Sequence, residues 1–470
     1  MSLVINTNIS SLQTQNNLSK SQSALAQATQ RLSSGLKINS AADNAAGFAI
    51  SQQYNTQVGG LRQASANASD AINLAQTAGS ALDQVTANLQ AIRDLAVQSA
   101  NGTYTDADRA SINQEVQQRL QEITRIANQT TFNGSNVLDG SMKTKSFQIG
   151  ANVGQTISVS LETNVKASKI GQVAEVNTGS IASTFAGLSV ASGSTGGLTV
   201  AVGSGAAVNV AAGTYHSVSG LAAAINNAAG GSTPLATVNA SGQLVLDSSV
   251  TLGGDDATTL GTPDSTTGVV PNAQTAVGDL SGQTLTINGQ DVKLTGVTSL
   301  QDLSDAINAA GIAGVGAAVN AAGTGVNFYS SGALSITDSA GSVITGNAID
   351  GNSGQAYKSG DSAGTAGSLA NGSVLTVDSA NDLISRIDVA LTTVSNFSAQ
   401  LGAVQNRFQS TISTVQAQTT NLQSSQSTIQ DADFASETAS LSKAQVLQQA
   451  GISVLAQANS NPQQVLKLLQ

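Results

Sequence analysis

Residues 387–429 read IDVALTTVSNFSAQLGAVQNRFQSTISTVQAQTTNLQSSQSTI, and in this stretch an apolar residue recurs at every seventh position. These positions are Ile387, Val394, Leu401, Phe408, Val415, Leu422 and Ile429. Seven-residue spacing aligns side chains on one stripe of a helix, as in a coiled coil. The second core position of each heptad is mixed, since it includes Ser398, Gln405, Thr419 and Gln426. The pattern therefore predicts a long helix packed in a mixed bundle rather than a two-stranded coil.

The N-terminal flank shows the same period. Its stripe consists of Leu61, Ala68, Ala75, Leu82, Leu89 and Ala96. One helix over about residues 44–100 would be roughly 85 Å long at 1.5 Å per residue. After Asn101 and Gly102, the pair Thr105 and Asp108 has the spacing of a capping box, which predicts a second helix that ends before FNGSNVLDG.

A joint precedes the long N-terminal helix. Leu18, Leu25 and Leu32 form one helical stripe, and Gly35 interrupts it. Ser40 and Asp43 then have capping-box spacing, which predicts that their side chains accept from backbone N–H groups where a new helix starts at Ala45. Near the other end of the chain, the apolar pattern restarts after Asp431, and Pro462 predicts the first turn of a short final helix.

The middle of the chain differs in composition. Residues 165–370 contain four Lys, no Arg and twelve acids, a balance of −8, whereas the flanks together have 14 basic and 16 acidic residues, a balance of −2. The segment LAAAINNA at 221–228 recurs as LSDAINAA at 303–310, each between short alternating strands. This predicts two α+β modules at about 190–250 and 280–340. SFQIGANVGQTISVSL predicts a β-hairpin turning at 152–154.

Composition excludes several classes of protein. A net charge of −10 without a basic patch argues against nucleic-acid binding. No cysteine is present, so disulfides and thiolate metal sites are excluded, and the lone His216 rules out catalytic constellations that need a second imidazole. The Gly-rich segments lack the phosphate-loop pattern. Asp255 and Asp256 fit a solvated turn better than a calcium site. We therefore expect no enzyme, no cofactor and no metal.

No membrane partner is expected either. The chain has no run of about 18 apolar residues, and MSLVINTNIS lacks the regions of a cleavable secretory signal. These signs alone would predict a cytoplasmic protein. However, apolar tips at both ends, INTNI and VLKLL, are better explained by burial in an assembly. The predicted fold is mainly α with an α+β insert: a long-helix, coiled-coil-like bundle formed by both flanks, with a β-hairpin and small outer α+β modules.

Several motifs resemble bacterial flagellins. RLSSGLKINSAADNAAGFAIS at 31–51 is similar to the N-terminal signature of that family, together with INTNISSL, LQAIRDLAVQSANG and EITRIANQTTFNG. The likeness spans about the first 165 residues. The C-terminal 90 residues resemble the family through IQDADFASETASLSKAQVLQQAG, SVLAQAN and QQVLKLL. The insert of about 200 residues lies outside the shared signature.

The resemblance implies a secreted filament subunit that polymerises into the extracellular flagellum for motility, after export through the flagellar type III apparatus. It overturns the cytoplasmic prediction. Residues 1–43 and 432–470 would form the inner filament core, 44–165 and 375–431 the surrounding bundle with its hairpin, and 166–374 a variable outer region. The implied partners are further copies of the chain, an export chaperone, and hook-associated and cap proteins.

Self-assembly is expected to involve small and apolar residues of these segments, with residues 31–51 as the connector. The candidates are Leu18, Leu25, Leu32, Gly35, Asn44, Phe48, Ile50, Val394, Leu401, Phe408, Val415, Leu422, Ile429, Leu447, Leu455, Leu466 and Leu469.

The resemblance also implies recognition by the vertebrate flagellin-sensing toll-like receptor. The contact helix of activating flagellins resembles L-Q-R-I-R-E-L-A-V, and residues 89–97 read LQAIRDLAV. Arg93, Leu95 and Glu115 match the family, whereas Ala91 replaces an arginine.

Two alternative functions are also compatible with the sequence. A hook-filament junction protein would share both helical ends, although QVLQQAG and LKLLQ agree better with flagellin. An adhesin would bind a glycan or surface through the outer modules, but no aromatic platform supports it.

Overall fold

The computed structural model describes residues 8–193, 196–231 and 233–468, with side chains as far as residue 460. The chain divides into two compact units. Unit 1 comprises the described residues of Met1–Ala75, Lys145–Val159 and Ala403–Gln470, and unit 2 comprises those of Gln76–Thr144 and Ser160–Gly402. The long helices are α1 (Ile9–Ser34), α2 (Ala45–Ala100), α3 (Asp106–Gln129), α8 (Val377–Gln430) and α9 (Phe434–Leu468).

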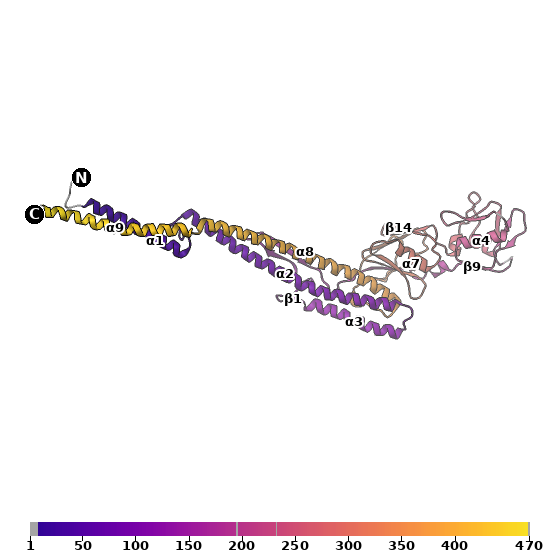
Figure 1. The fold of residues 1–470 in the computed structure, drawn as a ribbon. Helices are drawn as coiled ribbons and strands as arrows, with labels where there is room; N and C mark the ends of the chain where they lie inside the picture. Colours follow the sequence, from indigo (N-terminus) through magenta and orange to yellow (C-terminus); the bar gives the residue numbers. More distant parts are fainter. Residues whose placement is uncertain (1–7, 194–195, 232, 469–470) are drawn as a thin grey trace. The chain divides into compact units, whose positions relative to one another are not determined.

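In unit 1, α1 and α9 lie side by side (Figure 1). They approach closely where Leu18 faces Gly451, because a Cβ atom on Gly451 would lie 3.3 Å from Leu18 Cδ1. The salt bridge between Arg31 and Glu437, with an N–O distance of 3.9 Å, also joins the two helices. Leu18 therefore packs against a helix position that has no side chain.

The joint between α1 and α2 is hydrogen-bonded to the joint between α8 and α9. Gly35 caps α1 at a φ of +72°, a left-handed conformation that favours glycine. The Lys37 N–H donates to Gln430 O at 2.7 Å, and the Ala432 N–H donates to Gly35 O at 2.9 Å. Both interruptions of the helical pattern therefore lie at one level of unit 1.

The predicted start of α2 at Ala45 is confirmed, but its predicted cap is wrong. Asn44 caps the helix, since its Oδ1 accepts from the Gly47 N–H at 2.9 Å. The Asp43 carboxylate instead accepts from the N–H groups of Asn39 and Ser40, at 3.1 and 2.9 Å. These bonds, with the Ser40 backbone first, lower the pKa of Asp43. Asn44 directly precedes α2 and therefore caps it. The Asp43 carboxylate, one residue further from the helix, stabilises the preceding turn through its bonds to Asn39 and Ser40.

A separate final helix at Pro462 was also predicted wrongly, because α9 continues to Leu468. Proline has no N–H and leaves the carbonyl four residues earlier without its helical donor. That carbonyl belongs to Ala458, and it accepts from Asn8 Nδ2 at 2.8 Å. The α1 N-terminus thus supplies the missing donor, and Ser11 Oγ adds a bond of 2.8 Å to Asn459 Oδ1.

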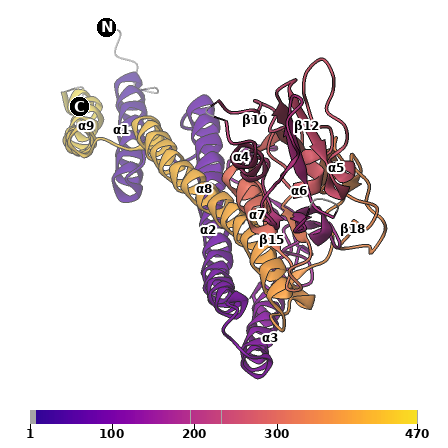
Figure 2. The ribbon, with the colours of Figure 1, turned by 90° about the vertical axis from the view of Figure 1, so that its right-hand side faces the viewer.

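In unit 2, the helical core follows the predicted stripes. Thr105 and Asp108 form the expected capping box of α3. The buried apolar residues from the three helices include Leu82, Val85, Leu89, Ile92, Ala96, Ile112, Val116, Leu120, Ile123, Ala127, Ile387, Val394 and Leu401. Figure 2 shows α2, α3 and α8.

The strands are short. Those before the insert are β1 (Thr131–Phe132), β2 (Ser135–Asn136), β3 (Lys143–Gln148) and β4 (Thr156–Leu161), and β3 pairs with β4 as the predicted hairpin. The later strands are β5 (Ala174–Asn177), β6 (Leu188–Val190), β7 (Thr199–Val202), β8 (Val208–Asn209), β9 (Gly213–Tyr215), β10 (Ala236–Val238), β11 (Leu244–Leu246), β12 (Val250–Gly253), β13 (Gln283–Ile287), β14 (Gln290–Leu294), β15 (Val315–Val319), β16 (Val326–Ser330), β17 (Leu334–Asp338), β18 (Ile349–Asp350) and β19 (Ser362–Ala363).

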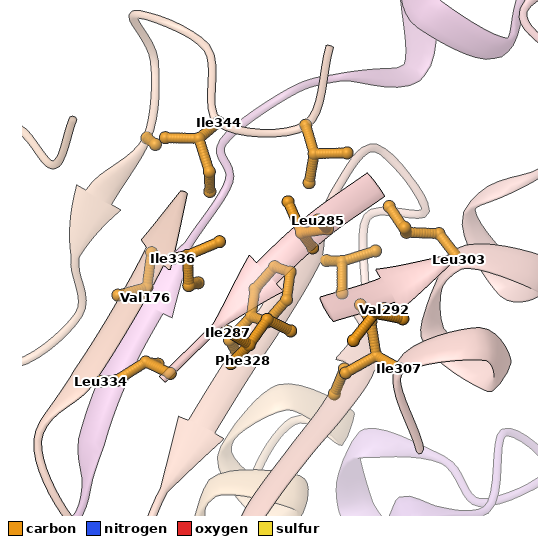
Figure 3. Packing of buried hydrophobic residues seen from close by; sticks show 14 of the residues in the cluster. Val176, Leu285, Ile287, Val292, Leu303, Ile307, Phe328, Leu334, Ile336 and Ile344 are labelled. Atoms are coloured by element: carbon orange, nitrogen blue, oxygen red, sulfur yellow. The ribbon is translucent and has the colours of Figure 1, made fainter. Parts of the chain in front are cut away.

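The insert has two separate hydrophobic cores. The first module spans residues 188–277 and includes α4 (Val218–Ala229), α5 (Asp255–Leu260) and α6 (Ala273–Val277). The second module spans 280–363, includes α7 (Leu300–Ala309), and takes in Ala174 and Val176 of β5. Phe328 and Ile287 lie at the centre of its core (Figure 3).

The two modules contain equivalent hydrogen bonds. Asn226 in α4 donates to Ala236 O at 2.7 Å and accepts from the Ala236 N–H at 2.8 Å. Asn308 in α7 makes the same pair of bonds with Ala317, both at 2.8 Å. Each asparagine therefore attaches its helix to the first strand of the following hairpin.

Candidate assembly surface of the terminal helices

The terminal helices expose large apolar side chains. Ile9, Leu12, Phe434, Val446, Leu447, Ile452 and Val454 have exposed fractions between 49% and 67% in the described structure. Leu447 and Val454 are seven residues apart, so they share one face of α9. Burying such a half-exposed side chain in another molecule would contribute on the order of 1 kcal/mol. This set, which we call the terminal apolar row, favours association.

The predicted assembly residues differ in exposure. Leu18, Leu25, Leu32, Phe48, Leu422, Ile429 and Leu455 are half-buried in the described part of the chain. Ile50 and Leu447 are exposed, at 41% and 49%. Gly35 and Asn44 cap α1 and α2. Leu466 lies within α9 without a described side chain, and Leu469 lies outside the described residues.

Four of the predicted assembly residues, all heptad positions of α8, are buried inside the chain itself. These are Val394, Leu401, Phe408 and Val415. The Phe408 ring contacts the Phe147 ring edge-on in unit 1, at a centroid separation of 5.7 Å. Such contacts stabilise the fold of the single chain, so a role in assembly would be indirect for these positions.

Most residues of the terminal apolar row are not predicted from the sequence. Val446, Ile452 and Val454 are not among the predicted residues, because the heptad stripe ends at Ile429 and such periodicity selects the side of a helix that packs within one chain. The signal that was available is a large apolar residue on an otherwise polar helix face. Ile9 was included only as part of the INTNI tip.

The predicted receptor-contact residues lie on α2 and α3 of unit 2. Arg93 is bound to Asp388 in a two-pronged ion pair, with Nε–Oδ1 and Nη2–Oδ2 distances of 2.7 and 3.3 Å. Glu115 accepts from Arg119 Nη2 at 2.7 Å. Ala91 and Leu95 are half-buried. Arg93 is therefore already neutralised, by an exposed pair of a kind that contributes about 0.2–1 kcal/mol.

A buried charged cluster connects α8 with the segments that lead into and out of the second module. The Arg386 side chain is 8% exposed. Its Nη1 donates to Ala366 O at 3.0 Å, its Nε donates to Asp382 Oδ2 at 2.7 Å, and its Nη2 lies 4.0 Å from Glu175 Oε2. Gly367 adjoins the guanidinium, since a Cβ there would lie 2.3 Å from Nη1. The backbone at Gly367 therefore passes too close to the Arg386 guanidinium for a side chain to fit there.

Two carboxylates share that single cation. Burial, reinforced by the charge of Asp382 and opposed by Arg386, raises the pKa of Glu175 to about 7. Burial also raises the pKa of Asp382. Glu175 therefore changes charge near neutral pH.

Comparisons with known proteins identify the family. The family described as "Bacterial flagellin N-terminal helical region" matches residues 5–143, and "Bacterial flagellin C-terminal helical region" matches residues 384–469. The B-type flagellin of Pseudomonas aeruginosa is 39% identical, and the flagellins of Salmonella typhimurium and Escherichia coli are 37% and 36% identical. Each alignment covers 100% of both chains.

Solved structures give weaker similarity. The structure of FliC from Burkholderia pseudomallei has a TM-score of 0.32 and 26% identity, covering 72% of this chain and 99% of that one. The flagellar junction protein FlgL from Legionella pneumophila has a TM-score of 0.35 and 13% identity, covering 82% and 100%. The full-length sequence matches decide the assignment: this chain belongs to the bacterial flagellin family.

Proposed function

We propose that this chain is the structural subunit of a bacterial flagellar filament, which polymerises outside the cell after export through the flagellar type III apparatus and serves motility. The observation that carries this proposal is the terminal apolar row: α1 and α9 pack together and still expose large apolar side chains. Flagellins are structural proteins, and their full-length similarity to this chain supports the same role. In the described residues, no helix is both long and apolar enough to cross a membrane.

We propose the corresponding division of labour along the chain. Residues 1–43 and 432–470 form the inner filament core, 44–165 and 375–431 form the bundle around it, and 166–374 form the variable outer region. The hydrogen-bonded joint of Gly35 and Lys37 with Ala432 and Gln430 supports the first boundary. Val173 and Ala366, which exchange two backbone hydrogen bonds of 3.3 and 3.0 Å, support a boundary near the outer region.

Deleting residues 174–365 and joining Val173 to Ala366 through an Asn-Gly turn is expected to preserve polymerisation. The two joined residues already form a backbone pair, and a two-residue Asn-Gly turn suits antiparallel connections. Seeded growth, followed by light scattering and electron microscopy, checks this. A shortened chain that retains native helical circular dichroism but never elongates would contradict the division.

Other partners follow from the same role. Hook-associated and cap proteins would contact the filament ends, and an export chaperone would cover the terminal apolar row before assembly. Val446 and Val454, exposed at 63% and 55%, are the α9 positions that such a chaperone would protect.

We also propose that the monomer is a weakened agonist of the flagellin-sensing toll-like receptor, contacted through Arg93, Leu95 and Glu115. Ala91→Arg is expected to increase potency roughly thirtyfold, because an interface arginine often contributes about 2 kcal/mol. Dose–response curves of receptor-expressing cells, with monomeric protein, measure this. Ala91→Gln is the matched control for side-chain length. Superimposable curves for wild type and Ala91→Arg would refute the proposal.

A further inference from the structure

The two modules differ at one sheet edge. In the second module the sheet order is β14-β13-β17-β19, and β19 covers the outer edge of β17 through the pairs Leu334–Ala363 and Ser335–Ser362. In the first module the corresponding order is β8-β7-β12. Since the segment before β12 (LVLDSS, 244–249) matches the segment before β17 (VNFYSS, 326–331), β12 is the counterpart of β17. In the described structure β12 has no strand at the position of β19.

The pairing with β7 leaves the other edge of β12 available. The Gly203 N–H donates to Ser249 O at 2.7 Å, and Thr251 lies opposite Ala201. In an antiparallel pair, hydrogen-bonded residues alternate along the strand. The N–H and C=O of Leu252 therefore point away from β7, toward the open edge.

A groove adjoins this edge. It has a volume of about 1070 Å³, and its lining includes all of β12 together with Leu246, Ala257 and the loop of residues 261–268. β10, β12 and α5 of this module are labelled in Figure 2. Four residues of strand extend about 13 Å. The Val250 N–H, which also points away from β7, already donates to Asp247 O at 2.8 Å. The groove thus offers the N–H and C=O of Leu252 along one wall, and free backbone groups at a sheet edge are the requirement for adding a strand.

The groove is strongly acidic. Asp247 and Asp264 line it, and Asp255 and Asp256 start the adjoining α5. Hydrogen bonds, led by the Ser249 hydroxyl for Asp247 and the Thr267 N–H for Asp264, lower the pKa of both carboxyls and keep them charged. The segment 170–292 contains no Lys or Arg, so no cation of the first module offsets them.

We propose that this groove binds a cationic, extended segment of a partner protein, which adds to β12 as a further strand of the β12–β7–β8 sheet. The second module shows the mode of binding, because β19 completes its equivalent edge within the same chain. The negative charge of the groove favours a cationic partner segment, since unlike charges within a Debye length of about 8 Å attract. The proposal goes beyond the filament role and does not depend on it.

The probe is a capped heptapeptide in which lysine alternates with threonine and valine, titrated into the full-length monomer by isothermal calorimetry. We expect micromolar binding that weakens at least tenfold when alternate peptide amides are N-methylated. Leu252→Pro should cause a similar loss, because it removes an outward N–H, the placement in which edge strands tolerate proline. Equal binding of the N-methylated peptide, or of a glutamate version of it, would overturn the proposal.

A second variant keeps the backbone intact. Asp247→Asn with Asp264→Asn should weaken peptide binding about tenfold and reduce its salt dependence, whereas Asp291→Asn with Asp305→Asn in the second module makes the same charge change and should have no effect. Equal losses of peptide affinity in both double variants would show that only the net charge of the chain matters, and would contradict a specific binding site at this groove. Monomers that bind the peptide while filaments exclude it would assign the groove to a neighbouring copy instead.

Discussion

Removal of residues 440–470 is expected to abolish filament growth completely while leaving unit 2 folded. The truncation deletes most of α9 and with it Val446, Leu447, Ile452 and Val454 of the terminal apolar row. It also removes Gly451, against which Leu18 packs, and the Ala458 carbonyl that binds Asn8. Sedimentation after seeding should recover all of the truncated chain in the supernatant.

Point substitutions separate the loss of the surface from the loss of the helix. Val446→Glu with Val454→Glu places two charges on the terminal apolar row and should stop growth at unchanged helical content. Ser453→Glu, at the exposed neighbouring position, should elongate like the wild type. Normal growth of the double variant would contradict the assignment of this surface.

Arg386→Met is expected to lower the free energy of unfolding of unit 2 by about 3–5 kcal/mol at pH 8, because removing one partner of a buried ion pair leaves the other uncompensated. The carboxylates that lose their cation are those of Glu175 and Asp382, whose side chains are 14% and 23% exposed. Backbone carbonyls of Gly171 and Ala366 lose a donor as well. Urea titrations monitored by circular dichroism measure the loss.

The free energy of unfolding measured in these urea titrations is also expected to depend on pH. The pKa of Glu175 is raised to about 7, so its contribution to stability is full below its ordinary value of 4.5 and is lost as the pH rises through 7. For the wild type this change is roughly 3 kcal/mol. Arg386→Met should therefore be less damaging at pH 5 than at pH 8, and Glu175→Gln should flatten the wild-type profile between these values. An equal loss at both pH values would show that the carboxylates do not carry the effect.

Much of the helical architecture was predictable from sequence because the heptad period reports burial within one chain. Ile387, Val394 and Leu401 lie in the unit 2 core, as their spacing indicates. Boundaries were less certain where two side chains compete. Asn44 and Asp43 can both accept backbone N–H groups, and the position next to the helix decides that Asn44 caps it. Pro462 was misread because the compensating donor, Asn8, is 450 residues away from Ala458.

The sheet edges of the insert were beyond the reach of sequence reasoning. The repeated helices α4 and α7 and their asparagines were visible as a motif. However, β5 and β19 join the second module from outside the repeat, and pairing at such separations leaves no local pattern. The terminal apolar row could not be predicted for a related reason, because the surfaces proposed to cover it belong to another molecule.

Electron microscopy of the purified full-length chain after seeding distinguishes a filament subunit from a junction protein. A filament subunit forms long tubes of uniform diameter whose length increases with the monomer supplied. Growth that stops after a single short layer on each seed, with the remaining chain monomeric, would contradict it and would instead indicate a junction protein.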